Sequence, residues 1–142
     1  MIIEWNHYIK WGEFESTHGT ILPFKWEFDR LEHFPQRDDA NLIIAAVRCL
    51  AYPYEIVGIR SIHPQMLIPY CTSRYDPKTK TFDGIKPKGK YVVYDDAITT
   101  GQTICECIRE VGRKAEFAIC IVDRGNWHYT FDVKTIIDIL RD

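Results

Sequence analysis

The sequence lacks long apolar runs and lacks an excess of positive charge. No stretch approaches the ~20 consecutive apolar residues of a membrane-spanning helix, and Met1–Trp5 does not resemble the start of a secretory signal peptide. The formal net charge is −2, whereas a nucleic-acid-binding surface usually carries a basic excess. These absences predict a cytoplasmic protein with no membrane partner, and they argue against a nucleic-acid partner.

Cysteine is present, but not in the pattern of a metal site or a disulfide framework. The chain has five cysteines and no Cys-x-x-Cys pair. Cys105 and Cys107 are two residues apart in a predicted helix, so they point to different sides and make a poor pair of metal ligands. We therefore expect reduced thiols, as in other cytoplasmic proteins.

The length and the composition indicate one ordinary globular domain. A chain of 142 residues, 46% hydrophobic and 27% charged, can bury one core. No internal repeat or low-complexity segment divides it. We predict a single domain over residues 1–142, with short strands and turns over residues 1–35 and the core in residues 36–142.

Apolar residues at helical or strand spacing mark the core elements. A helix is expected to begin at Asp38–Ala40 and to end before Pro53, and a short β-branched strand follows at Glu55–Ile59. Residues Thr72–Lys90 are basic and rich in turn-forming residues, without hydrophobic periodicity, and predict an irregular loop or a solvated surface hairpin. The tail, Phe131–Leu140, is compatible with a short helix or a strand.

The clearest pattern is a strand, a helix and a second strand in succession. Tyr91–Tyr94 is an apolar strand, an amphipathic helix follows through Ile104–Val111 and ends at Gly112, and Phe117–Val122 is a second buried strand. This order predicts a right-handed βαβ unit. The fold class is therefore α/β, with a mostly parallel central sheet flanked by helices.

The segment between that first strand and the helix has the composition of a phosphate-binding loop. Free amides and the helix dipole attract an anion at a helix N-terminus, threonine hydroxyls add donors, and a glycine permits close approach of the backbone. Ligands also gather at the carboxyl ends of strands in open α/β sheets. The candidate ligand-binding residues of this segment are Asp95, Asp96, Ala97, Ile98, Thr99, Thr100, Gly101, Gln102 and Thr103.

The two aspartates require a different ligand group, because carboxylates repel phosphate. They suit sugar hydroxyls, or a Mg²⁺ ion held indirectly through the ribose or through water. A phosphate and a diol together indicate a phosphorylated ribose. Simple capping of the helix would need one acidic or hydroxyl residue, not the whole set from Asp95 to Thr103.

The run from Val92 to Thr103 resembles the phosphoribosyl pyrophosphate (PRPP) motif of type I phosphoribosyltransferases. The resemblance implies that fold, with Asp95 and Asp96 on the ribose hydroxyls and Ala97–Thr103 around the 5-phosphate. It also implies an enzyme that transfers a phosphoribosyl group from PRPP to a nucleobase and releases pyrophosphate. Gln102 departs slightly from the motif, which more often has a small residue at that position.

Shorter matches point toward the orotate-specific members of the family. Gly12-Glu13-Phe14, Gly19 and Pro23-Phe24 are similar to their N-terminal hood, so residues 1–35 are expected to form a small hood. The resemblance assigns base binding to Arg124, whose planar cation suits the orotate carboxylate, and to Trp26. It places catalytic cations in a mobile loop at Arg74, Lys78 and Lys80, and pyrophosphate-binding residues at Arg60 and Ser61.

The resemblance also implies Mg²⁺ as cofactor, and a homodimer in which the loop reaches the neighbouring site. Tyr75 and Lys80 stand where family members have a lysine and a histidine, and the pyrophosphate loop is altered as well. Two alternatives therefore stay open. One is a transferase for another base, because a neutral purine does not need the cation of Arg124. The other is a non-catalytic sensor or regulator that binds PRPP.

Overall fold

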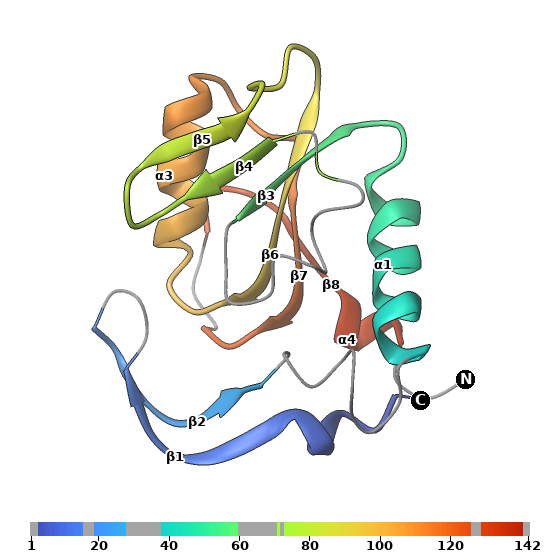
Figure 1. Ribbon diagram of the computed structural model, residues 1–142, viewed down its shortest axis with the longest axis vertical. Helices are drawn as coiled ribbons and strands as arrows, with labels where there is room; N and C mark the ends of the chain where they lie inside the picture. Colours follow the sequence, from blue (N-terminus) through green and yellow to red (C-terminus); the bar gives the residue numbers. More distant parts are fainter. Residues whose placement is uncertain are drawn as a thin grey trace.

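The computed structural model describes residues 3–15, 19–27, 38–59, 71, 73–125 and 129–140. Figure 1 shows a central sheet with helices on both faces and a separate hairpin at its lower edge. The elements in chain order are η1 (Trp5–Tyr8), β1 (Ile9–Glu15), β2 (Ile21–Trp26), α1 (Asp38–Ala51), β3 (Glu55–Ile59), β4 (Ser73–Asp76), β5 (Thr81–Gly84), β6 (Tyr91–Ile98), α3 (Gln102–Val111), β7 (Ala118–Asp123), β8 (Val133–Thr135) and α4 (Ile136–Ile139).

The six-stranded sheet has the order β5-β4-β3-β6-β7-β8. β4 and β6 both run parallel to β3, and β7 continues the parallel arrangement to β8. Only β5 is antiparallel to its neighbour within the sheet. The predicted α/β class is confirmed, and β6, α3 and β7 form the predicted strand–helix–strand unit with parallel strands.

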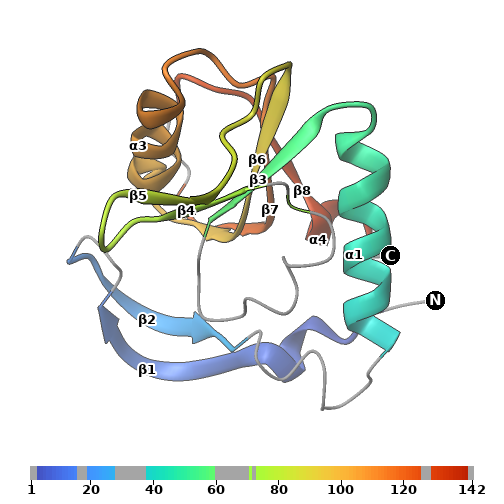
Figure 2. The same ribbon diagram turned by 45° about the horizontal axis from the view of Figure 1, so that its top comes forward.

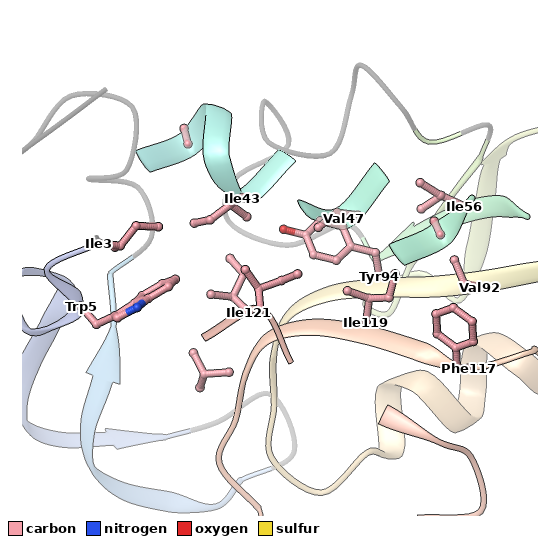
Figure 3. Packing of buried hydrophobic residues seen from close by; sticks show 14 of the residues in the cluster. Ile3, Trp5, Ile43, Val47, Ile56, Val92, Tyr94, Phe117, Ile119 and Ile121 are labelled. Atoms are coloured by element: carbon pink, nitrogen blue, oxygen red, sulfur yellow. The ribbon is translucent and has the colours of Figure 1, made fainter. Parts of the chain in front are cut away.

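The core has two layers, one on each face of this sheet. Alternate residues of β6 point to opposite faces, as the pleat requires: Val92 and Tyr94 join the cluster under α1, whereas Tyr91 and Val93 join the cluster under α3. Figure 3 shows the first layer, in which α1 side chains meet those of β6 and β7. The continuous apolar runs of the strands reflect this burial on both faces.

Several predicted boundaries are confirmed. β3 has the predicted bounds, α1 begins at Asp38, and α3 ends at Gly112, whose left-handed φ of 89° provides the helix C-cap. β6 is longer than expected, because its pairing with β7 continues to Ile98. The tail, for which a short helix or a strand was expected, contains both, since the strand β8 is followed directly by the helix α4.

Of the two interpretations of residues 72–90, the irregular loop is wrong for two segments, and a hairpin is present. β4 pairs with β3, and β5 forms a hairpin with β4. The ring of Tyr75 is fully buried in the α3 layer and lies 5.4 Å from the ring of Phe82. These residues form strands because they pair with the edge of β3 and with each other, although their local sequence has no strand periodicity.

The hairpin β1–β2 lies within residues 1–35, the segment for which a hood stays a prediction, and "hood" below means this hairpin. It forms its own two-stranded antiparallel sheet. Figures 1 and 2 show it beyond the end of the main sheet at which β6 and β7 terminate. Its base is attached to α1, because the Tyr8 hydroxyl donates a 2.5 Å hydrogen bond to the buried carboxylate of Asp39. No helix among the described residues is both long enough and apolar enough to span a membrane.

Candidate phosphoribosyl-binding site

The carboxyl ends of β6 and β7 bring the main candidate residues to one place. The two strands are parallel neighbours, with Asp95 opposite Cys120 and Ala97 opposite Val122. The Arg124 N–H then donates a 2.7 Å hydrogen bond to the carbonyl of Ile98. The PRPP-like segment and the base-binding candidate are therefore fixed side by side.

Asp95 is a buried carboxyl group at the end of β6. Its side chain is 8% exposed, and its Oδ1 accepts a 2.8 Å hydrogen bond from the Asp96 N–H. Burial, reinforced by the neighbouring Asp96 charge, holds the pKa of Asp95 well above its usual range. Asp95 is therefore better suited to a structural, hydrogen-bonding role than to the role of a negatively charged group that binds a substrate or a metal ion.

Asp96 is half-buried and more accessible. Its Oδ1 accepts a 2.7 Å hydrogen bond from the Ala97 N–H. A carboxylate has several lone-pair directions, so one such bond leaves room for a further donor. Of the two aspartates, Asp96 is the one whose environment suits a ribose hydroxyl or a metal-bound water.

The turn from β6 to α3 is formed by Thr99, Thr100 and Gly101. Gly101 has a φ of 79°, in the left-handed region that favours glycine. A Cβ at this position would lie 2.7 Å from Cδ1 of Tyr129, so the turn requires glycine for space as well. The Thr100 hydroxyl accepts a 3.3 Å hydrogen bond from the Gln102 N–H at the start of the helix. The helix N-terminus and the threonines together can donate to an anion.

Arg124 contacts the hood. Its Nη2 donates a 2.6 Å hydrogen bond to the carbonyl of Phe24, and its guanidinium lies 4.3 Å from the centre of the Phe24 ring. Its Nε is buried and has no hydrogen-bond partner among the described residues. Burial lowers the pKa of Arg124 from its ordinary value. The reason is that removing a cation from water disfavours its charged form unless other groups replace the lost water contacts.

Trp26 is on the same hairpin and packs against the core. Its ring meets Trp5 edge-on at 6.5 Å and packs against the α1 layer. Phe24 and Trp26 are T-shaped neighbours at 6.2 Å, two residues apart on one face of the strand. The base-stacking role of Trp26 stays a prediction, whereas Phe24 is the hood aromatic that lies on Arg124.

The predicted catalytic cations lie on β4 and on the turn that follows it. Arg74 is half-buried on β4, and Lys78 and Lys80 are exposed on the four-residue turn. Because β4 is parallel to β3 and β6, this turn lies at the same edge of the sheet as the end of β6. Two strand spacings separate β4 from β6, about 10 Å. The predicted pyrophosphate residues Arg60 and Ser61 follow β3 and lie outside the described residues.

The residues fit a metal ion only through indirect contacts. Among the described side chains, no group of three or more His, Cys, Asp or Glu residues is arranged to hold an ion directly. Asp96 offers the one accessible carboxylate at the end of β6, and a single carboxylate with substrate oxygens and water is a common Mg²⁺ environment. The indirect roles of Asp95 and Asp96 at a metal ion stay predictions, and Asp96 is the more accessible of the two.

Three residues at the site were missed in the sequence. Phe24 could have been recognised, because period-two spacing places it on the same face as Trp26. Asp123 and Tyr129 form a 2.7 Å hydrogen bond beside the turn. Asp123 directly precedes Arg124 in the sequence, but nothing in the local pattern around Tyr129 indicates this tertiary contact.

Comparison with solved structures defines the class: the chain has the type I phosphoribosyltransferase fold. Leishmania donovani UMP synthase matches with a TM-score of 0.62 and 20% identity, covering 92% of this chain and 33% of that one. Orotate phosphoribosyltransferase from Aeropyrum pernix matches with a TM-score of 0.60 and 21% identity, covering 84% and 77%. The resemblance predicted from the sequence is confirmed at the level of the fold.

At the level of sequence, the chain is similar to a hypoxanthine/guanine phosphoribosyltransferase of Methanocaldococcus infernus. The two are 30% identical over 87 residues, which span 58% of this chain and 48% of that relative. The match thus covers about half of the relative's length. No model of a known protein family matches the sequence.

Proposed function

We propose that the chain transfers a phosphoribosyl group from PRPP to a nucleobase and releases pyrophosphate. The observation that carries the proposal is the end of β6, where Asp95 and Asp96 lead into a glycine-containing turn at the start of α3. That turn lies beside Arg124 on the neighbouring strand. The fold of the orotate-specific neighbours and the similarity to the hypoxanthine/guanine relative both support this class of reaction.

The proposed reaction breaks the bond between C1 of the ribose and the pyrophosphate oxygen, and forms a bond to a ring nitrogen of the base. Asp96 accepts hydrogen bonds from the ribose hydroxyls, and the turn before α3 holds the 5-phosphate. Positioning and neutralisation of the leaving pyrophosphate supply most of the catalysis. A bound Mg²⁺ would neutralise part of the diphosphate charge, and Lys78, Arg74, Lys80, Arg60 and Ser61 are the protein groups proposed to assist.

We propose orotate as the first candidate base. A partly buried guanidinium whose Nε has no hydrogen-bond partner among the described residues favours an anionic ligand, because Nε and an Nη can donate side by side to a carboxylate, although Nη2 also donates to the Phe24 carbonyl. Phe24 is proposed to contact the face of the base. The hypoxanthine/guanine relative supports a purine as the alternative, and a purine would not need the charge of Arg124.

Three further parts of the hypothesis stay predictions. The hood and the β4–β5 turn are proposed to exclude water from the reacting centre, which would otherwise hydrolyse PRPP. A homodimer would let the turn act on a neighbouring site. A cytoplasmic location follows from the substrates proposed.

The test is pyrophosphate release from PRPP and Mg²⁺ with orotate, hypoxanthine and guanine supplied separately. We expect release with orotate, and we expect Arg124→Ala to raise the KM for orotate at least tenfold, since charged hydrogen bonds contribute about 1.5–3 kcal/mol. Arg109→Ala, an exposed arginine near the end of α3, is the matched control. Release only with a purine would replace the base assignment and keep the transferase.

A PRPP sensor is the second candidate function. The burial of Tyr75 favours it, because this residue replaces a lysine expected from the family resemblance and contributes no charge to the site. A sensor would bind PRPP saturably and release no pyrophosphate with any base. Loss of that binding in Asp96→Asn would still identify the site, whereas no binding of PRPP to the wild-type chain would overturn both functions.

A further inference from the structure

Tyr129 connects the turn before α3 to the end of β7. The single proton of its hydroxyl is shared between two acceptors, Oδ1 of Asp123 at 2.7 Å and the carbonyl oxygen of Thr99 at 3.3 Å. Oδ1 of Asp123 accepts a second hydrogen bond, 3.0 Å long, from the Gly125 N–H. One tyrosine thus joins two segments that are adjacent at the carboxyl edge of the sheet.

The ring of Tyr129 adds a second contact with the same turn. It stacks on Phe131 with ring centres 5.1 Å apart and planes inclined by 7°. Two of its ring carbons would lie 2.7 and 2.8 Å from a Cβ at Gly101, so the ring lies close against that glycine. Phe131 is buried in the α3 layer and provides a fixed support. The turn is therefore held by both the ring and the hydroxyl of Tyr129.

The direction of the Thr99 carbonyl affects what the turn can bind. In a planar trans peptide, the C=O of one residue and the N–H of the next point in opposite directions. A hydrogen bond from Tyr129 to the Thr99 carbonyl therefore turns the Thr100 N–H to the opposite side of the chain. There it can donate to an anion together with the amides at the start of α3.

We propose that Tyr129, oriented by Asp123, is a positioning residue that holds Thr99–Gly101 in the conformation that binds the 5-phosphate of PRPP. This inference rests on the proposed function, which supplies the phosphate ligand. The role requires the hydroxyl to stay a donor. Burial and its hydrogen bond to Asp123 raise the pKa of Tyr129, so it stays protonated at neutral pH.

The test compares Tyr129→Phe with Tyr52→Phe, a control that removes a hydroxyl from a side chain 82% exposed. Ribose 5-phosphate is the probe, because it carries the 5-phosphate without the pyrophosphate. Tyr129→Phe retains the ring over Gly101 and is expected to weaken ribose 5-phosphate about fivefold, the effect of one neutral hydrogen bond. Tyr52→Phe is expected to bind as the wild type does.

Two further measurements separate positioning from general stability. Amide hydrogen exchange at residues 99–101 of the ligand-free Tyr129→Phe protein should be faster, with an unchanged melting temperature. Asp123→Asn should weaken ribose 5-phosphate in the same direction. The double variant should lose less than the product of the two single effects, because both act through one contact.

The outcomes distinguish this inference from the function on which it rests. Unchanged ribose 5-phosphate affinity in Tyr129→Phe, with a wild-type protein that binds the probe, would overturn the role of Tyr129 and leave the proposed function intact. A wild-type protein that binds neither ribose 5-phosphate nor PRPP would overturn both. A lowered melting temperature with unchanged exchange at the turn would assign Tyr129 to stability and overturn the positioning role.

Discussion

Two turns lie at the same edge of the sheet, and they are held in different ways. The turn Thr99–Gly101 is fixed from outside, through Tyr129 and through the bond from Arg124 to Ile98. The turn Pro77–Lys80 is held by its own backbone: the Lys80 N–H donates to the carbonyl of Asp76 at 2.7 Å. A second local bond, 2.9 Å long, joins the Lys78 N–H to the Asp76 carboxylate.

The difference matches the two tasks that the proposed function assigns to these turns, which are binding of the phosphate and assistance to the leaving pyrophosphate. A phosphate-binding turn gains affinity when its donors are already in place, since no ordering has to accompany binding. Cations that assist a leaving group can remain solvated until the substrate arrives, because they act only on the charge that develops there. Tertiary contacts around the first turn and exposed lysines on the second agree with this division.

The largest effect is expected beneath the second turn, at Tyr75. Tyr75→Ala should lower the free energy of unfolding by about 3–5 kcal/mol, the usual cost of removing a buried aromatic ring, because this side chain is fully buried. Tyr75→Phe should cost little, since the hydroxyl has no hydrogen-bond partner among the described residues. Urea unfolding measures both variants.

Tyr52→Ala, at an exposed position, is the control for this experiment and should change stability by less than about 0.5 kcal/mol. A Tyr75→Ala protein as stable as that control would mean that residues 73–84 are a loose loop. The two turns would then differ even more than the structure indicates.

The second effect separates backbone strain from the contact with Tyr129. Gly101 and Gly112 have similar left-handed φ angles, 79° and 89°, but a Cβ meets the Tyr129 ring only at Gly101 and meets nothing within 4 Å at Gly112. Gly112→Ala should cost about 1 kcal/mol of stability and Gly101→Ala about 2 kcal/mol or more. Thermal unfolding compares them, and only Gly101→Ala should also weaken PRPP. Equal losses in both variants would show that Tyr129 does not confine the first turn.

The sequence predicted the elements whose signals are local. β3, α1, α3 and β7 each have a continuous apolar run or helical periodicity, together with a recognisable end such as Gly112. The phosphate-binding turn was predicted for the same reason, since all of its residues are contiguous. Arg124 was assigned through the family resemblance, because it directly follows the buried strand β7.

What the sequence did not predict depends on contacts between distant segments. β4 and β5 have little periodicity and became strands by pairing with β3 and with each other. Tyr129 contacts Thr99, thirty residues earlier, and no local pattern specifies that approach.

The third effect tests the exposed turn itself. Lys78→Ala should lower kcat for pyrophosphate release about tenfold, equivalent to ~1.4 kcal/mol, with little change in the affinity for PRPP. The reason is that its charge is needed mainly as the leaving group develops. Lys114→Ala, an exposed lysine just beyond the end of α3, is the matched control. Unchanged turnover in Lys78→Ala would remove the second turn from the catalytic assignment.

The smallest effect distinguishes the two hood aromatics. Phe24→Leu should raise the KM for the base about three- to tenfold, as expected when a stacking face of ~1 kcal/mol is lost beside Arg124. Trp26→Leu should instead lower the melting temperature and leave that KM nearly unchanged, because Trp26 packs on Trp5 and on the α1 layer. Steady-state kinetics with the active base and thermal unfolding of both variants give the two readouts. The reverse pattern, with KM raised only in Trp26→Leu, would support the assignment of Trp26 to the base. It would also imply that the contact of Phe24 with Arg124 serves to attach the hood to the end of β7.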